Sequence, residues 1–200
     1  KSETPVTLAR LVASDREIRT AANASGMQDV QLLEGREASS AGLKRALAKR
    51  PEILHFAVHV VSPDRNPQQA ALALSLTDDN MPELLTPEAI ETYRVAGSLV
   101  VLSGCSSAKG KVLPSAGLMG LTRAWLVAGA SAVIATGWPT PDDSGLFFSC
   151  FYRHFQSMRS GSLAKRAAAA LRSAQLEMEQ SQGYRSSPSF WAAYSIICKE

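Results

Sequence analysis

The sequence predicts an α/β fold whose mainly parallel sheet is flanked by helices on both faces. Its buried strands are predicted by three short apolar runs, Ile53–Val61, Leu99–Leu102 and Ala132–Thr136. A short apolar run bounded by turn residues is typical of a parallel strand that is covered on both sides. Segments rich in helix-forming residues alternate with these runs, which is the pattern of α/β proteins.

The other elements follow from start and stop signals. Serine or threonine before a helical pattern, proline at its first position and glycine just past its end mark the boundaries of helices. These signals predict helices at 14–25, 39–48, from Thr86 onward, and at 116–128, 142–159 and 162–182. Further strands are predicted at Val30–Leu33, at Ala71–Leu76 and within 191–198, and loops at 62–70 and 106–115.

Composition and charge exclude several classes of protein. Apolar residues make up 46% of the 200 residues and charged residues 20%, as in a soluble globular domain. The net charge of +3 is spread along the chain without a basic patch, and no apolar stretch approaches 18 residues, so we expect neither a nucleic-acid surface nor a membrane span. Three cysteines, odd in number and far apart, predict a reducing, cytoplasmic setting and no zinc site. The abrupt amino terminus suggests a fragment of a longer chain that forms a single domain over 1–200.

Two reactive side chains follow predicted strands. Cys105 comes directly after the Leu99–Leu102 run, beside Gly104 and Ser106, and His59 stands near the end of the Ile53–Val61 run. In open α/β sheets, catalytic groups collect just beyond the carboxyl ends of parallel strands. A thiol with a pKa near 8.5 is mostly protonated at neutral pH, and a nearby imidazole is a usual means of activating it. We therefore predict a thiol–imidazole pair.

Other interpretations of these residues compete with that prediction. Cys105 is also compatible with a buried, inert cysteine. Ser106 nearly completes a nucleophile elbow, but a serine hydrolase needs a helix directly after it and a later acid and histidine. His55 shares a face with His59 if the run is one strand, and we expect it to be a hydrogen-bonded core residue rather than a zinc ligand. His154 is expected on a helix, in contact with solvent or in packing.

Five ordered motifs over residues 8–198 resemble CHAT domains, which are caspase-like, separase-related cysteine peptidase domains often fused to tetratricopeptide repeats. The motifs are Ile53–His59, residues 99–107, Gly120–Ala130, Trp138 with Asp142 and Asp143, and Phe190–Tyr194. The resemblance implies a caspase–hemoglobinase fold. It also implies a His59–Cys105 dyad that hydrolyses peptide bonds, with an oxyanion hole formed by the backbone N–H groups of Val60 and Cys105.

The resemblance further implies a preference for cleavage after a basic residue, arginine above all. Asp142 or Asp143 would pair with the guanidinium group, because a carboxylate holds it with two parallel hydrogen bonds. Gly104 and Trp138 complete the expected substrate contacts. The alternatives are that Asp142 or Asp143 caps the helix that follows and that Trp138 is a core aromatic residue. We expect a protein or peptide substrate, regulatory domains such as helical repeats elsewhere in the same protein, and no cofactor or metal ion.

One position departs from the family pattern. Val60 stands where the family has glycine after the catalytic histidine. If that position needs a positive φ, a β-branched residue is strained there. If only its backbone N–H group is used, valine is tolerated, at the risk of crowding the substrate carbonyl. An oxyanion-hole donor lowers the barrier by about 3–4 kcal/mol, so a misdirected amide would lower the rate about 10²-fold or more. The alternative function is therefore a pseudo-protease that acts as a regulatory or binding module.

Overall fold

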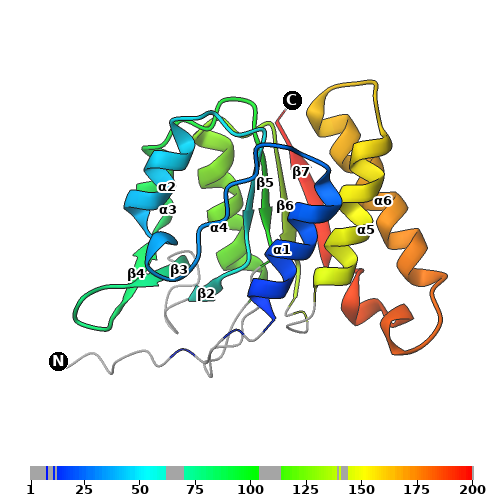
Figure 1. The fold of residues 1–200 in the computed structure, drawn as a ribbon, viewed down its shortest axis with the longest axis horizontal. Helices are drawn as coiled ribbons and strands as arrows, with labels where there is room; N and C mark the ends of the chain where they lie inside the picture. Colours follow the sequence, from blue (N-terminus) through cyan, green and yellow to red (C-terminus); the bar gives the residue numbers. More distant parts are fainter. Residues whose placement is uncertain are drawn as a thin grey trace.

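A four-stranded sheet, sheet A, lies at the centre of the protein (Figure 1). The computed structural model describes residues 8, 11, 13–61, 70–103, 114–138, 140 and 144–199, with the side chains of 114–118 excepted. The strands of sheet A are β1 (Ile53–Phe56), β5 (Leu99–Leu102), β6 (Ala132–Thr136) and β7 (Tyr194–Cys198), in the order β1-β5-β6-β7. The first three are parallel and β7 is antiparallel to β6, so the predicted mainly parallel sheet is confirmed.

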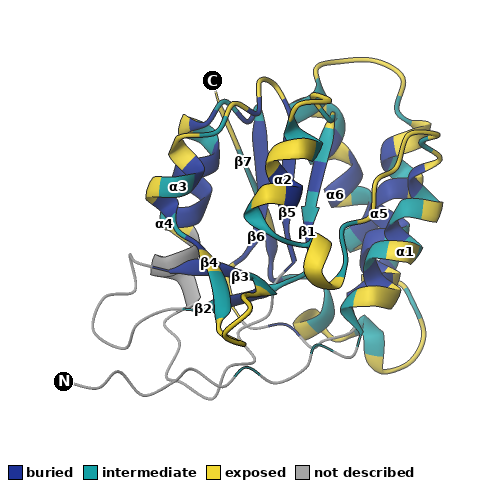
Figure 2. Cartoon of the chain, turned by 60° about the vertical axis from the view of Figure 1, so that its left-hand side comes forward, coloured by how far each residue is buried: buried dark blue, intermediate teal, exposed yellow. Residues whose placement is uncertain are grey.

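Helices cover both faces of sheet A. On one face lie α1 (Ser14–Ser25), α5 (Gly145–Ser157) and α6 (Leu163–Glu179), and on the other side lie α2 (Ser40–Leu47), α3 (Pro87–Glu91) and α4 (Pro114–Val127). Strand residues alternate between two apolar clusters: Val100 packs toward α4, and Val101 packs toward α5 and α6. Figure 2 shows β5 buried between the layers. Short 3₁₀ turns lie at Gly35–Glu37, Tyr184–Ser186 and Pro188–Phe190.

Local chemistry explains why the helices begin and end where predicted. The side chains of Ser39, Thr86 and Ser162 each accept a hydrogen bond from a first-turn N–H group, which satisfies a donor that the helix itself leaves free. Gly26 follows α1 with a φ of 61°, a left-handed conformation that glycine adopts without strain. In the described part of the chain, no helix combines the length and apolarity that a membrane crossing requires.

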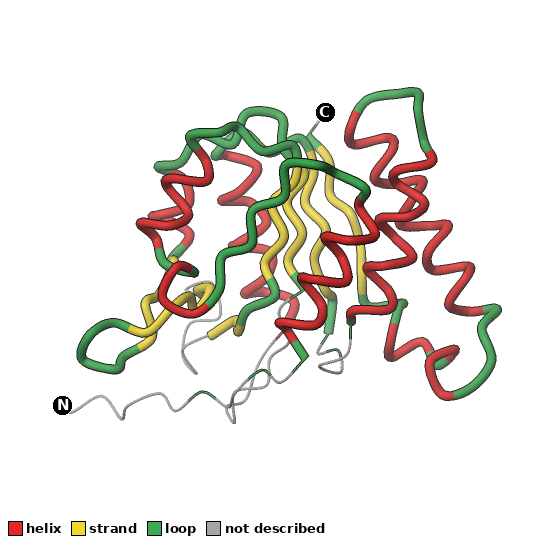
Figure 3. Tube along the Cα trace, viewed as in Figure 1, coloured by secondary structure: helices red, strands yellow, loops and turns green. Residues whose placement is uncertain are grey.

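A second, three-stranded sheet lies beside the first and was not predicted. Sheet B is antiparallel and contains β2 (His59–Val61), β3 (Ala71–Leu76) and β4 (Pro82–Leu85), in that order (Figure 3). The run Ile53–Val61, predicted as one strand, is divided between β1 and β2. His55 and His59 therefore lie in different sheets and do not share one strand face. An uninterrupted apolar run carries no signal for a change of sheet.

Two further predictions of strands need correction. Residues 30–33 form an irregular segment in which Val30 and Leu32 are exposed, and no strand in the described part of the chain pairs with them. The strand β4 was missed, since it begins with Pro82 and Glu83, residue types that are uncommon in strands. It forms through pairing with β3, where Leu85 lies opposite Leu72 and is fully buried.

Candidate active site at the carboxyl ends of β1 and β5

Ser103 joins the carboxyl ends of two parallel strands. It follows the last residue of β5, and the final pair of the β1–β5 register is Phe56 with Leu102. The Ser103 N–H group and its hydroxyl both donate to the Phe56 carbonyl oxygen, over 3.0 and 3.1 Å. We call these two hydrogen bonds the Ser103–Phe56 clasp. Beyond it, His59 follows Phe56 after three residues, and Cys105 follows Ser103 after two.

Several predicted site residues lie outside the described residues. They are Gly104, Cys105, Ser106, Asp142 and Asp143, together with most of the predicted loops at 62–70 and 106–115. Ser144, the residue after Asp143, is described and buried, and its hydroxyl accepts a hydrogen bond of 2.8 Å from the Tyr194 hydroxyl. Trp138 follows β6 and is 43% exposed, so its ring is available to a ligand at this edge of the sheet.

His59 and Val60 are fixed by sheet B. Both are buried, and they pair with Ala73 and Leu72 of β3. The Val60 side chain packs into the same apolar cluster as Leu72 and Leu85. Among the described residues other than glycine, only Arg50 and Asn80 have a positive φ, so Val60 has an ordinary extended backbone. Valine is therefore unstrained at this position, and its side chain belongs to the core.

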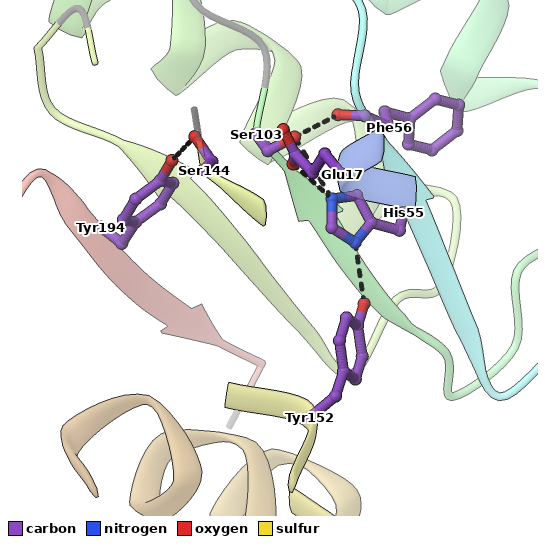
Figure 4. Close-up of polar contacts among 7 residues, drawn as sticks. All are labelled: Glu17, His55, Phe56, Ser103, Ser144, Tyr152 and Tyr194. Carbon is purple, nitrogen blue, oxygen red and sulfur yellow. Dashed lines mark hydrogen bonds and ion pairs between the residues drawn. The ribbon is translucent and has the colours of Figure 1, made fainter. Parts of the chain in front are cut away.

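His55 is the centre of a buried polar cluster below the clasp (Figure 4). Its Nδ1 lies 3.0 Å from the Tyr152 hydroxyl, and its Nε2 lies 3.0 Å from Glu17 Oε1 and 3.2 Å from Ser103 Oγ. Both ring nitrogens are thus engaged, as expected for a hydrogen-bonded core histidine. Glu17 and Tyr152 were not among the predicted site residues. Glu17 lies on the same face of α1 as Ala21 and Ser25, at a spacing of four residues, and all three are buried, but the sequence carries no apolar pattern that marks this face.

The remaining histidine and two cysteines lie elsewhere. His154 Nε2 is 2.8 Å from Glu177 Oε2, which connects the last turn of α5 to α6. Burial and a hydrogen bond to Glu177 raise the pKa of the Cys150 thiol, which disfavours the nucleophilic thiolate. Cys198 pairs with Ala132 at the start of β6, so it lies at the opposite edge of sheet A from the clasp.

A cavity of about 760 Å³ lies beside β1, between this strand, α1, α2 and the irregular segment that contains residues 27–33. Its lining is mostly apolar and includes Leu33, Leu43 and Ile53, with His55 and Tyr152 at one side. The lining extends to Val58, the residue before His59. A ligand in this space would therefore lie beside Val58.

Comparison with known proteins agrees with the sequence motifs. The family model of the CHAT domain matches residues 1–199. Over 115 residues, 57% of this chain, the sequence is 37% identical to tetratricopeptide repeat protein 28 of Mus musculus. It is 35% identical to the Homo sapiens protein of the same name over 115 residues. The match covers 4% of each relative, so the chain spans a small part of these proteins.

Proposed function

The chain belongs to the CHAT domain family, which is related to the caspase-like peptidases, and from this membership we propose that it is a cysteine endopeptidase. His59 and Cys105 form its catalytic dyad, and it cleaves peptide bonds after a basic residue, with arginine preferred. The observation that carries the proposal is the Ser103–Phe56 clasp, which joins the two strand ends from which the dyad residues depart.

Chain length supports the pairing of His59 with Cys105. A residue spans at most about 3.6 Å, so Cys105 lies within about 7 Å of Ser103 and His59 within about 11 Å of Phe56. Because Ser103 N and Phe56 O are 3.0 Å apart, the two chain segments that lead to Cys105 and His59 begin next to each other.

The proposed reaction proceeds through an acyl-enzyme. His59 takes the thiol proton, and the Cys105 thiolate forms a C–S bond with the scissile carbonyl carbon. The oxyanion accepts hydrogen bonds from the N–H groups of Val60 and Cys105. His59 then gives its proton to the leaving amine as the C–N bond breaks. Water, deprotonated by His59, attacks the thioester and releases the acid, which restores the Cys105 thiol.

Specificity is assigned to the segment between β6 and α5. Asp142 or Asp143 binds the guanidinium group of the substrate in a bidentate pair, which lysine matches less well. The exposed Trp138 ring, four residues earlier, provides an apolar surface for the stem of the same side chain. Gly104, which has no Cβ, lets the substrate backbone approach Cys105.

We also propose that the domain operates in the cytoplasm as part of a larger, regulated protein. The Cys150 and Cys198 thiols are free, as is usual in a reducing compartment. The relatives are named for tetratricopeptide repeats, which supports helical repeats as the regulatory domains. The test is a pull-down of the domain with the repeat region of its own full-length protein.

Labelling with a peptidyl acyloxymethyl ketone that carries a terminal arginine tests the proposed enzyme. We expect the wild type to carry one adduct, mapped to Cys105 by mass spectrometry, and Cys105→Ala to carry none. Cys198→Ser removes an exposed thiol at the opposite edge and serves as the matched control, with full labelling. A probe with glutamate in place of arginine should react at least about 10-fold more slowly, since the guanidinium–carboxylate pair is lost.

The outcome also decides between the enzyme and the pseudo-protease. An unlabelled wild type that gains labelling with Val60→Gly would show a protease silenced at its oxyanion hole. Absence of labelling in both proteins would favour a binding module. The extended, unstrained backbone at Val60 favours the enzyme.

For Val60→Gly we expect no gain in activity and a loss of stability. The change removes a buried side chain from the core cluster, and glycine weakens a strand through its backbone entropy. Burial of a valine side chain contributes about 1.5–3 kcal/mol, and glycine in a strand costs a further 0.5–1 kcal/mol or so. Urea denaturation should therefore show a fall of about 2–4 kcal/mol in the free energy of unfolding. A rise in kcat above the wild type would contradict the expectation.

A further inference from the structure

The buried cluster around His55 brings together groups from four elements. Glu17 comes from α1, His55 from β1, Ser103 from the end of β5 and Tyr152 from α5. Glu17 is 4% exposed, and His55 also packs edge-on against Phe148, with ring centroids 4.6 Å apart. We call Glu17, His55, Ser103 and Tyr152 the Glu17 cluster. A carboxylate in such surroundings is costly unless it is paired and hydrogen-bonded.

One arrangement of protons gives each polar group around His55 a hydrogen-bond partner. Burial, together with the nearby Glu17 carboxylate, raises the pKa of the Tyr152 hydroxyl, so this group stays protonated and donates to His55 Nδ1. The opposite ring nitrogen, Nε2, then carries the proton and donates to Glu17 Oε1 and toward Ser103 Oγ. The Ser103 hydroxyl is left to donate to the Phe56 carbonyl.

The cluster therefore ends at the clasp that precedes both dyad residues. Glu17 orients the imidazole of His55, His55 holds Ser103 Oγ, and Ser103 binds the carbonyl of Phe56. Each link is a directional hydrogen bond between atoms 3.0–3.2 Å apart. A change at Glu17 should consequently move the point from which Gly104 and Cys105 leave the sheet.

We propose that Glu17 and His55 are positioning residues for the reaction of His59 and Cys105. They hold Ser103, from which the chain continues to Cys105, against Phe56 at the end of β1, without contact to substrate. The inference rests on the proposed function. Its physical basis is the sensitivity of catalysis to geometry, since a misplacement of about 1 Å can lower a rate about 100-fold.

Two substitutions at Glu17 separate positioning from stability. Glu17→Ala removes the acceptor for His55 Nε2, and we expect kcat to fall about 30–100-fold with KM changed less than about 2-fold. Glu17→Gln keeps an oxygen acceptor of the same shape, so kcat should recover to within about 5-fold of the wild type. Both are assayed well below their midpoints of thermal unfolding. Tyr152→Phe, which removes the donor to Nδ1, should lower kcat about 5–10-fold and decides the question if Glu17→Ala does not fold.

The pair of His154 and Glu177 provides the matched control. It is also a histidine–glutamate contact between elements, at 2.8 Å, but it joins α5 to α6 away from the clasp. Glu177→Ala should leave kcat unchanged. Folded Glu17→Ala with wild-type kcat would overturn the inference, and so would a loss of kcat that Glu17→Gln fails to restore.

A second readout distinguishes this inference from the proposed function. The rate of Cys105 alkylation by iodoacetamide, mapped by mass spectrometry, reports the activated thiolate and needs no cleavage. Equal rates in the wild type and His59→Ala would overturn the proposed function and the inference with it. If the wild type is alkylated faster than His59→Ala, and Glu17→Ala reacts at the wild-type rate, the inference alone is overturned. We expect Glu17→Ala to lower the rate about 10-fold or more.

Discussion

Replacing His59 with alanine should lower kcat/KM for an arginyl fluorogenic peptide by about 10³-fold or more. The imidazole is proposed to act twice, first as the base for the Cys105 thiol and then as the acid for the leaving amine. Each such proton transfer contributes about 10²–10⁴-fold to a rate. His59 is held in β2 opposite Ala73, so alanine at this position is compatible with the pairing of sheet B.

The pH dependence of Cys105 alkylation shows whether His59 stabilises the thiolate. A thiolate stabilised by a neighbouring imidazolium persists below neutral pH, because the opposite charge lowers the pKa of the thiol. In His59→Ala that charge is missing, so the alkylation rate should fall off below a pH of about 8.5, the ordinary value for cysteine. Alkylation of the wild type at pH 6.5 should therefore be much faster than that of the variant.

His154→Ala is the control for His59→Ala, because it removes an imidazole that contacts Glu177 on α6. Its kcat/KM should equal that of the wild type. Full activity of His59→Ala, with Cys105→Ala inactive, would mean that another group activates the thiol. Full activity of Cys105→Ala would remove Cys105 from the reaction and return Ser106 to consideration as the nucleophile.

The parts of the fold that were predictable are those with local signals. The end of α1 and the starts of α2 and α3 agree with the prediction, because Gly26 follows α1 and a capping hydroxyl precedes α2 and α3. The strands β5 and β6 were also predicted with their bounds, since each is a short, fully buried run. The residues beside these elements mark where each begins or ends, so the local sequence is enough to predict the boundary.

The parts that were not predictable depend on partners far away in the sequence. Residues 30–33 have the composition of a strand but lack a pairing partner among the described residues, whereas Pro82–Leu85 has a poor composition and is paired with β3. The division of the 53–61 run between two sheets likewise follows from pairing, with β5 for Ile53–Phe56 and with β3 for His59–Val61. Pairing is a tertiary property that overrides intrinsic preference.

The same distinction holds for the candidate site. Cys105 and His59 were identified from their place after predicted strands and from the resemblance to CHAT domains, and their pairing remains a prediction. The role of His55 as a hydrogen-bonded core histidine was predicted and is confirmed by its contacts with Tyr152 and Glu17. Its partners come from helices 38 and 97 residues away, a distance over which sequence patterns carry no information on contact.

The second large effect is expected for Trp125, which supports the site from the other face of sheet A. Trp125 of α4 is fully buried, and its ring lies 5.2 Å from that of Phe56 and 6.4 Å from that of Tyr93. Phe56 carries the carbonyl that accepts both bonds from Ser103. Trp125 therefore packs against the residue on which the proposed geometry of the dyad depends.

Trp125→Ala should lower the free energy of unfolding by about 3–5 kcal/mol, since it deletes the largest buried ring and leaves a cavity. That is a large fraction of the total for a domain, which is about 5–15 kcal/mol. Urea denaturation followed by circular dichroism measures the loss. Val127→Ala, on the same helix but with an exposed side chain, should change the value by less than about 0.5 kcal/mol.

Trp125→Phe distinguishes packing from hydrogen bonding. The indole Nε1 is buried and has no hydrogen-bond partner among the described residues. An unpaired buried donor is destabilising, so its removal offsets part of the volume that phenylalanine fails to fill. We therefore expect Trp125→Phe to cost less than about 1.5 kcal/mol. A cost as large as that of Trp125→Ala would mean that Nε1 is bonded in solution and that a polar contact, rather than apolar packing, holds α4 against Phe56.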